Sequence, residues 1–463
     1  MAAKRTGLRI LRADLARRRP VVHRSFSAAI TCRTDGVFTA LTNERVQIPW
    51  VEAFRKQQAE KATGVKAAGG GQQQTTKVER DLTPRKMSDS YHSVILPLAQ
   101  DPWLLDTYMN ATGQIRIGQL LMDLDALSGV VAYNHTGDGV STVTAACDRI
   151  TILNPLTEIC DLEYSGQVTY AAGRSSMEIT LQVAKAPKDG VKAKSEDVMM
   201  ICQFTMVSLD PATKKPVNIP AVRTDTEEEK RLFSEGEKNS KLRKALLQRS
   251  LLKQTPNDEE SDLIHAIWQK QLQYHDPNDP LRQPANVVAM EATKLSTASI
   301  MQPINRNRHQ FMIFGGFLLK QTFELAFCCA ASFAHARPTF VSLDPSTFQN
   351  PVPVGSVLYL TATVVYTDPP VVTGEADIPS STEAGRTRVQ VRVDTKVRDV
   401  EHGQARPTGQ FNYTFTVERG IQVMPRTYSE FMMYVDARRR ARKVVESMKD
   451  GETDDGRGER MTE

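Results

Sequence analysis

Two stretches of the chain, residues 87–220 and 290–425, repeat one another. An Asp followed six residues later by Asn-Pro occurs in both, at Asp148 and at Asp344, an offset of 196 residues. A second pair of similar segments leads into apolar residues at an offset of 198: Ile115–Gly118 and Ile313–Gly316. Such internal similarity indicates one structural unit made twice. Any fold for this chain must therefore be built from two like halves.

Each stretch has the same order of predicted elements: a short strand, an apolar helix and several further strands. The second helix, Phe317–Ala334, is apolar nearly all round, so it should be buried on most sides. Strands with period-two alternation follow, as in Met177–Leu181 and Val389–Val393. The sequence therefore predicts an α+β fold in which a curved antiparallel sheet wraps around a central helix, twice. The first helix carries one apolar stripe at helical spacing: Leu120, Leu121, Leu124, Leu127 and Val131.

Composition excludes several classes of protein. The chain has 463 residues and a mass of 51.6 kDa, which corresponds to about three ordinary domains. We find no uninterrupted apolar run of about 20 residues, the length that crosses a bilayer, and we predict no membrane insertion. The six cysteines show no CxxC and no histidine at zinc-finger spacing, so we expect free thiols and no metal or other cofactor. The adjacent Cys328 and Cys329 should be buried as small apolar residues.

The net charge of +5 comes from the N-terminus. Residues 1–26 hold eight Lys or Arg and one acid, a net +7, so the remaining chain carries −2. An Arg-rich, acid-poor leader is typical of a mitochondrial presequence, which we place at residues 1–35 with a processing site near Arg24–Ser27. The alternative is a disordered basic arm that binds nucleic acid. No aromatic platform or recognition helix follows the leader, so we expect no nucleic-acid partner.

Three further segments flank the repeated stretches. Residues 36–86 include polar sequence rich in Gly and Gln and should form a flexible N-terminal segment. Residues 221–289 are dominated by charge, with leucines at helical intervals, which predicts an exposed helical linker. Residues 426–463 carry a run of Arg and then turn acidic, so we expect a solvated helix end and tail. The expected domains are thus 1–35, 36–86, 87–220, 221–289, 290–425 and 426–463.

Several motifs occur in a specific order along the two stretches. The first has Asn110–Gly113, Ile115–Gly118 and Leu121–Asp125, and the second has Asn307–His309 and Ile313–Gly316. In this order, and doubled, these segments resemble the hotdog superfamily, specifically the double-hotdog acyl-coenzyme A thioesterases of the mitochondrial type. The resemblance covers both stretches. It implies two tandem hotdog domains forming an intramolecular pair, an acyl-coenzyme A substrate, a place in the mitochondrial matrix, and a homo-oligomer such as a trimer of double hotdogs.

The resemblance also implies where a site would lie. In the family, the Asn-bearing loop and helix start of one domain face an acid on the central helix of the other domain. Asp125 follows Gly118 by seven residues and precedes His135 by ten, which matches the position of the family's acid. Asp123 is then its solvent-facing neighbour. We therefore expect Asp125 to meet the Asn307–Gly316 segment of the second copy.

The second copy departs from this pattern. The residue seven positions after Gly316 is Phe323, and the nearest acid, Glu324, is displaced by one residue. One residue on a helix changes the direction of a side chain by about 100°. We infer that the reciprocal site, in which Asn110 and Gly118 face Phe323 and Glu324, is degenerate.

The residue types suit thioester hydrolysis, which requires a base or nucleophile at the carbonyl carbon and fixed donors at its oxygen. Asp125 would activate water or attack directly, and Asn307 would orient the water or the base. Free N–H groups at the helix start would polarise the carbonyl, with Gly315 and Gly316 allowing its approach. Phosphates of coenzyme A could be held by residues that begin strands after a glycine, although a solvated strand end explains these positions as well: Arg174, Ser175 and Arg386.

Each assignment has a structural alternative. Asp125 could be an acid that caps a loop, Asn307 could form a turn, and His309 could be an ordinary loop residue. His135, near the end of its helix, should bond the terminal carbonyls of that helix. The main alternative to hydrolysis is a non-catalytic hotdog subunit that binds acyl-coenzyme A or acts as a scaffold in a larger mitochondrial assembly. Hydration of an acyl thioester would need a second Asp/His pair, which the sequence does not clearly offer.

Overall fold

The computed structural model describes residues 81–452, apart from 155, 157, 187–194, 212, 249–253, 275–281, 308–311 and 375–384, together with residues 51, 52, 54, 55 and 58. The predicted presequence, most of the 36–86 segment, Cys32, His309 and residues 453–463 lie outside the described part.

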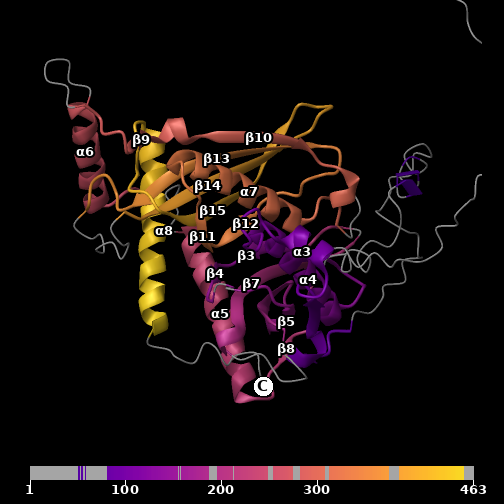
Figure 1. Cartoon of the computed structure of the whole chain (residues 1–463). Helices are drawn as coiled ribbons and strands as arrows, with labels where there is room; N and C mark the ends of the chain where they lie inside the picture. Colours follow the sequence, from indigo (N-terminus) through magenta and orange to yellow (C-terminus); the bar gives the residue numbers. More distant parts are fainter. Residues whose placement is uncertain are drawn as a thin grey trace, which may run out of the picture.

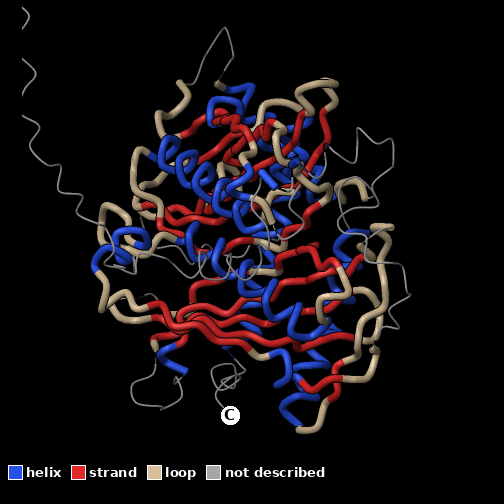
Figure 2. Tube along the Cα trace, turned by 90° about the vertical axis from the view of Figure 1, so that its right-hand side faces the viewer, coloured by secondary structure: helices blue, strands red, loops and turns tan. Residues whose placement is uncertain are grey.

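Strands from both copies form one large, mostly antiparallel sheet of twelve strands. The first copy contributes β2 (His92–Leu96), β3 (Ser141–Cys147), β4 (Ile150–Ile152), β5 (Leu162–Ala171), β6 (Ser176–Lys185) and β7 (Val198–Leu209). The second contributes β10 (Leu295–Ile300), β11 (Thr339–Leu343), β12 (Ser346–Phe348), β13 (Val357–Asp368), β14 (Thr387–Arg398) and β15 (Ala405–Val417). Each copy wraps one long helix, α4 (Ile117–Thr136) or α7 (Gly315–Ala334). Figure 1 shows the two copies side by side, the first in violet and the second in orange, and Figure 2 shows their strands and helices from a second side.

The two copies are joined through the sheet itself. Strand β4 pairs with β11, and β3 pairs with β12, both antiparallel. The duplication extends to an irregularity in register, which follows Thr144 in β3 and Phe340 in β11, again at an offset of 196. The molecule is therefore an α+β structure made of two equivalent halves that share one sheet.

The central helices supply the core. All five residues of the predicted stripe on α4 are fully buried, which confirms that prediction. Helix α7 is long and apolar enough to cross a membrane by length and composition, although Lys320 and Glu324 interrupt its apolar residues. In this structure it packs against α4, β13, β14 and β15, and half or more of it is buried inside the protein. Such a helix is a core element of the fold.

Glycines let α4 and α7 approach closely. Gly118 lies against Lys320 and Phe323, whereas Gly316 lies against the Met122 carbonyl, so the two helices run antiparallel. A Cβ on Gly316 would stand 2.8 Å from the Met122 oxygen, closer than side chains pack against backbone. Only glycine fits at this position.

The repeat continues past the expected domain boundary into two long helices, α5 (Glu227–Gln248) and α8 (Tyr428–Glu452). Each begins with the same capping arrangement, formed by Thr226 with Glu229 and by Thr427 with Glu430. Helix α5 packs on β5, and α8 packs on the equivalent β13. The segment expected to be an exposed linker thus has a packed face. Short parallel pairs precede the two long helices: β1 (Arg85–Lys86) with β8 (Val222–Arg223), and β9 (Val287–Ala289) with β16 (Gln422–Met424).

Helix α6 (Asp258–Gln273) lies between the two copies in sequence, after the first repeat has ended. Between residues 81 and 452, the described part of the chain also contains the helix α3 (Pro102–Tyr108) and the 3₁₀ turns η1 (Met87–Ser90), η2 (Ser195–Asp197), η3 (Met290–Thr293) and η4 (Pro303–Asn305).

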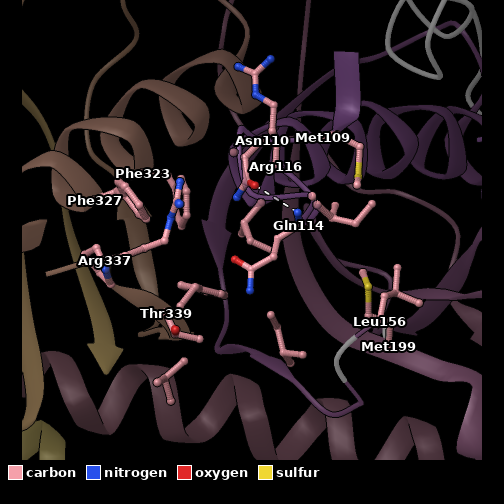
Figure 3. Close-up of a pocket in the computed structure, with 18 of the residues that line it drawn as sticks. Met109, Asn110, Gln114, Arg116, Leu156, Met199, Phe323, Phe327, Arg337 and Thr339 are labelled. Carbon is pink, nitrogen blue, oxygen red and sulfur yellow. Dashed lines mark hydrogen bonds between the residues drawn. The ribbon is translucent and has the colours of Figure 1, made fainter. Parts of the chain in front are cut away.

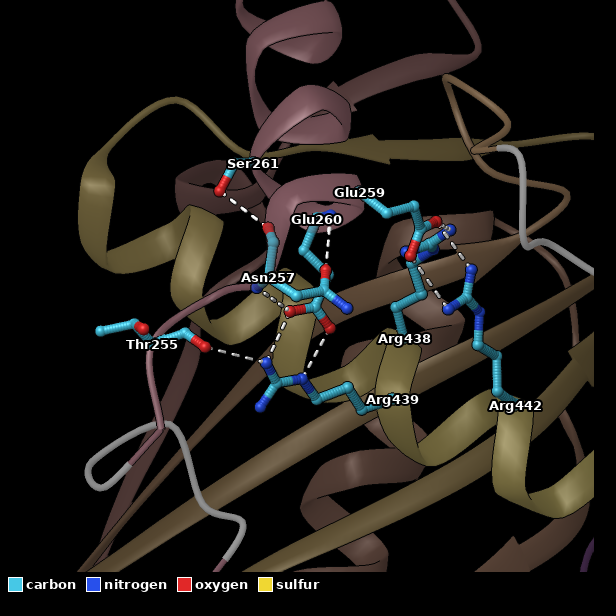
Figure 4. Close-up of polar contacts among 8 residues, drawn as sticks. All are labelled: Thr255, Asn257, Glu259, Glu260, Ser261, Arg438, Arg439 and Arg442. Carbon is cyan, nitrogen blue, oxygen red and sulfur yellow. Dashed lines mark hydrogen bonds and ion pairs between the residues drawn. The ribbon is translucent and has the colours of Figure 1, made fainter.

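The arginines near the C-terminus are not solvated, contrary to expectation. Arg438 is 2% exposed and donates to Glu259 (2.6 Å), which also accepts from Arg442 (2.9 Å). Arg439 pairs with Glu260 at 2.5 Å. Figure 4 shows these contacts, which fasten α6 to α8. The hydrogen bond from Arg438 lowers the pKa of Glu259 to about 2, so this carboxylate stays charged.

Candidate active site

Asp125 on α4 contacts the start of α7 from the other copy. The Gly316 N–H donates to Asp125 Oδ2 at 2.6 Å, across 191 residues of sequence. This is the contact that the resemblance to the double-hotdog thioesterases implies. It brings a carboxylate of the first copy to the helix N-terminus of the second, where free N–H groups and the positive end of the helix dipole lie.

The second oxygen of Asp125 also has a donor. Thr144 Oγ1, on β3, donates to Asp125 Oδ1 at 2.8 Å. The Asp125 side chain is buried, with 1% of its surface exposed. Donors on both oxygens, together with the α7 dipole, stabilise the charged carboxylate in this position and fix its orientation.

Gly315 is the accessible residue at this helix start. It is partly exposed, whereas Gly316 is buried. A Cβ on Gly315 would stand 3.1 Å from Asp125 Oδ2, so any side chain here would crowd the carboxylate. The N-cap residue of α7, Phe314, provides no side-chain hydrogen bond to this end, and Asp125 binds the Gly316 N–H. Backbone N–H groups at this end therefore remain suited to bind an oxygen of a ligand.

Asn307 and Asn110 occupy equivalent places at the base of the loop before each helix. The Asn307 N–H donates to the Met312 carbonyl, and the Asn110 N–H donates to the Gln114 carbonyl, both at 2.8 Å. The loop is one residue longer in the second copy. Asn110 Oδ1 accepts from the backbone of Thr112 (2.9 Å) and Gln114 (3.0 Å), so that side chain shapes a turn.

The reciprocal position holds an aromatic ring instead of a carboxylate. A Cβ on Gly118 would stand 3.3 Å from Phe323 Cδ1, just as Gly316 meets Asp125 in the first arrangement. The counterpart of Thr144 is Phe340, which packs edge-on against Phe323 with ring centroids 5.5 Å apart. Glu324 points elsewhere and pairs with Arg116 at 3.2 Å. A carboxylate held by a hydroxyl in one copy is thus a pair of packed rings in the other.

A cavity of about 1080 Å³ opens at this reciprocal position, and Asp125 is not among the described residues that line it. Figure 3 shows it between the Asn110 loop of the first copy and the Phe323–Phe327 face of α7 in the second. Asn110 and Gly118, both expected to contact substrate, line it. This cavity and the Asp125 carboxylate therefore lie at different ends of the α4–α7 pair.

With the geometry established, comparison with known proteins identifies the family. No family model matches the chain. Over 372 residues it is 34% identical to "Acyl-coenzyme A thioesterase 9, mitochondrial" of Homo sapiens, an alignment that covers 78% of this chain and 79% of the human protein. The chain belongs to the acyl-coenzyme A thioesterase family. This family member is also 31% identical over 376 residues to "Acyl-coenzyme A thioesterase 2, chloroplastic" of Humulus lupulus, covering 80% of this chain and 82% of that protein.

Among solved structures, the acyl-CoA hydrolase of Staphylococcus aureus in complex with butyryl coenzyme A, coenzyme A and coenzyme A disulfide is 25% identical to this chain. That match covers 41% of this chain and 99% of the hydrolase, with a TM-score of 0.30.

Two other residues of α4 have environments that differ from expectation. Asp123 is fully buried and not solvent-facing, because Tyr108 Oη donates to it at 2.6 Å from helix α3. His135 is also buried, and its Nε2 lies 2.9 Å from the Pro220 carbonyl instead of bonding the end of its own helix. Both partners come from segments outside the helix, which a helix-based argument does not include.

The residues expected to hold phosphates lie apart from both positions. Arg174 is exposed and Ser175 partly exposed at the start of β6. Arg386 pairs with Glu418 at 3.4 Å. None of the three is among the described residues that line the cavity.

Sequence reasoning missed Thr144. The internal repeat could have found it, because Thr144 and Phe340 are equivalent at the same offset of 196 residues as Asp148 and Asp344. The change from a polar residue at Thr144 to an aromatic one at Phe340 parallels the change from Asp125 to Phe323. One further expectation was wrong, because Cys328 is exposed and lines the cavity while Cys329 is buried.

Proposed function

We propose that this protein hydrolyses fatty acyl-coenzyme A to the free acid and coenzyme A in the mitochondrial matrix, using two tandem hotdog domains as one intramolecular pair. Membership of the thioesterase family supports the reaction, and the mitochondrial relatives support the location. The observation that carries the site assignment is the hydrogen bond between Asp125 of the first copy and Gly316 of the second.

In the proposed reaction Asp125 acts at the thioester carbon. As a general base it takes a proton from water, whose oxygen forms the new bond to that carbon; as a nucleophile it attacks the carbon first, and water then releases the acid. In either course the C–S bond breaks and the departing thiolate takes up a proton as coenzyme A. Thr144 holds the carboxylate through Oδ1 and is a positioning residue.

The negative charge of the tetrahedral intermediate needs donors of its own. Because the Gly316 N–H already binds Asp125, the Gly315 N–H at the accessible tip of α7 is the group we assign to the carbonyl oxygen. We assign Asn307, in the loop that precedes α7, to orienting the attacking water or the base. Such a donor lowers the barrier by about 3 kcal/mol. Gly316 then orients the base, and Gly315 stabilises the oxyanion.

A thiol-release assay tests the proposal. Protein lacking residues 1–35 should release free coenzyme A from at least one member of a series of acyl-coenzyme A substrates whose acyl chains run from two to eighteen carbons. The expected kcat is about 1–10³ per second, the usual range for enzymes. Boiled protein controls for spontaneous hydrolysis. Binding of these compounds without turnover at any chain length would contradict an enzymatic function.

The non-catalytic alternative also has support. Asp125 is 1% exposed, and the cavity lies where no carboxylate faces the helix start. A subunit that binds acyl-coenzyme A as part of a larger assembly would show both features. The same chain-length series separates the two functions, because only the enzyme releases thiol.

We also infer that the protein forms a homo-oligomer. Strands β2 and β10 lie at the two ends of the strand order, and each carries an exposed isoleucine, Ile95 (57%) and Ile300 (60%). Unprotected strand edges with apolar side chains favour association with another copy. A trimer of this double unit is the assembly that the family resemblance suggests.

A further inference from the structure

We propose that the cavity at the reciprocal position binds a second ligand, a long acyl chain with an anionic head, and holds it without hydrolysis. Such a ligand is either the acyl-coenzyme A substrate or the fatty acid that the reaction releases. The choice of ligand class rests on the proposed function, because the cavity occupies the duplicate of the proposed catalytic position. The cavity itself, and the presence of Phe323 where a carboxylate would face Gly118, rest on the structure alone.

The walls of the cavity suit an acyl chain. Apolar side chains from both copies form most of its lining, including Leu105, Leu156 and Met199 from the first and Phe327 from the second. Figure 3 shows Leu156 and Met199 on one side of the cavity and Phe327 on the other. A volume of about 1080 Å³ lies at the upper end of the range found for small-molecule sites, so it accommodates a long chain.

The charges at the cavity favour an anionic head. Two acids line it, and both have cationic partners: Glu324 pairs with Arg116 at 3.2 Å, and Glu158 with Lys185 at 3.6 Å. Arg337, also in the lining, is exposed and forms no ion pair with the described residues. Helix α4 starts at the same wall with its positive end and no described side-chain cap. The Arg337 guanidinium and the start of α4 are therefore the groups available to an anionic head.

Hydrolysis is unsupported here because the reactive groups have been replaced. Phe323 stands where a carboxylate would face Gly118, and Phe340 stands where a hydroxyl would hold it. Phe323 also packs against Phe415 and Tyr413, so the ring is part of the core. A ligand bound at this position meets a helix start with no carboxylate facing Gly118, and the carboxylate in the lining nearby, that of Glu324, is paired with Arg116.

Binding stoichiometry tests the proposal. S-hexadecyl-coenzyme A, a thioether that cannot be hydrolysed, is titrated into the full protein by calorimetry. Wild type should bind two equivalents per chain, and Leu156→Asp should bind one, because a carboxylate in the apolar wall excludes both chain and head. Val400→Asp places the same charge on an exposed apolar residue outside the cavity, 66% exposed, and should bind two. Thermal melting checks that both variants are folded.

Variants at Arg337 and Asp125 refine the test. Arg337→Glu should weaken the second binding event about tenfold, whereas Arg406→Glu, an exposed charge reversal outside the cavity, should not. Asp125→Asn should still bind two equivalents. If Asp125→Asn retained turnover, the proposed catalytic assignment would fail while the stoichiometry stood, so the two proposals fail separately.

Three outcomes overturn the second site: one equivalent in wild type, two equivalents in Leu156→Asp, or displacement of the second equivalent by free coenzyme A as effectively as by the thioether. Palmitate distinguishes the sources. Competition by palmitate for the second equivalent supports a site for the released acid, and its failure to compete supports a site for the thioester.

Alkylation of Cys328 gives an independent readout. This thiol is exposed and lines the cavity, while Cys147, Cys202 and Cys329 are buried. Burial raises the pKa of each of these three thiols, which makes them slow to react. S-hexadecyl-coenzyme A should slow iodoacetamide labelling of Cys328, located by mass spectrometry, in wild type and not in Leu156→Asp. Unchanged labelling in wild type would contradict the proposal.

Discussion

Two acids on α4, separated by one residue, have different environments. Asp123 and Asp125 point about 200° apart on the helix. Asp123 therefore enters the core of the first copy, where Tyr108 and Gln119 donate to it. Asp125 faces the other copy, where Gly316 and Thr144 donate to it. Only the second carboxylate lies at an interface between the halves, beside a helix start with unused N–H groups.

Thr144 should affect rate through the orientation of Asp125. Thr144→Val keeps the shape and removes the donor, so we expect kcat to fall about tenfold, as for loss of one hydrogen bond to a charged group. Thr144→Ser retains the hydroxyl and should stay within about twofold of wild type. The pH dependence of kcat should shift in the Val variant and not in the Ser variant. Equal rates for wild type and Thr144→Val would remove Thr144 from the mechanism.

His135 should make stability depend on pH. Burial lowers the pKa of His135 below its usual 6.5, with the Pro220 carbonyl acting in the opposite direction. The unfolded chain then binds a proton near pH 6.5 that the folded chain does not bind, so stability should fall as the pH drops from about 6.5 towards the lowered value. In denaturant titrations His135→Gln should flatten this part of the profile. An unchanged profile would show that His135 ionises freely in the fold.

At the scale of elements, the long helices α5 and α8 close each half by binding the repeated aspartate. Arg243 on α5 contacts Asp148 and also Glu178 on β6 (2.9 Å). Arg440 on α8 reaches Asp344 at 3.3 Å. The Asp of the sequence repeat is thus a buried anchor for a helix, and the charged segment after each copy is part of the unit.

Removal of Arg243 should destabilise the protein most at high pH. Burial and the nearby Asp148 raise the pKa of Glu178 to about 7, and burial raises that of Asp148, while Arg243 opposes both shifts. Arg243→Met should cost about 3 kcal/mol of unfolding free energy at pH 8, as for a buried pair that loses one partner, and less at pH 5.5, where Glu178 is protonated. Arg231→Met, which breaks an exposed pair with Glu228, should cost under about 0.5 kcal/mol.

The internal repeat placed the doubled elements, and the resemblance to the double-hotdog thioesterases placed Asp125 against the start of α7. Comparison of the residues seven positions after Gly118 and after Gly316 then showed that Phe323 takes the acid's place. The arginines of α8 could not be interpreted this way, because their partners Glu259 and Glu260 lie on α6, roughly 180 residues earlier and outside the repeat. The burial of Asp123 depended on Tyr108, and the cavity on packing between the halves; neither has a periodic signal.

At the scale of the whole molecule, one sheet and two antiparallel helices create two positions related by the duplication. One position has the Asp125 carboxylate and the Thr144 hydroxyl, and the cavity opens at the other. This division would let a single chain carry the proposed reactive centre and a separate binding cavity without a further domain.

Association of whole molecules can be measured directly. Light scattering coupled to size exclusion should give a mass that is a multiple of 51.6 kDa, less any leader removed, and three copies for a trimer. Ile300→Lys on the edge strand β10 should lower that mass, because a charged edge disfavours pairing. A wild-type protein that stays monomeric across the concentration range would contradict the inference of a homo-oligomer.

The central claim is that the carboxylate of Asp125 acts at a thioester carbon beside the start of α7. The measurement that tests it most directly is the single-turnover rate of thiol release by Asp125→Asn, with Asp123→Asn as the matched control on the same helix. We predict a loss of at least about a hundredfold for Asp125→Asn, as for removal of a general base, and a rate within about threefold of wild type for a folded Asp123→Asn. Equal rates for Asp125→Asn and wild type would contradict the account.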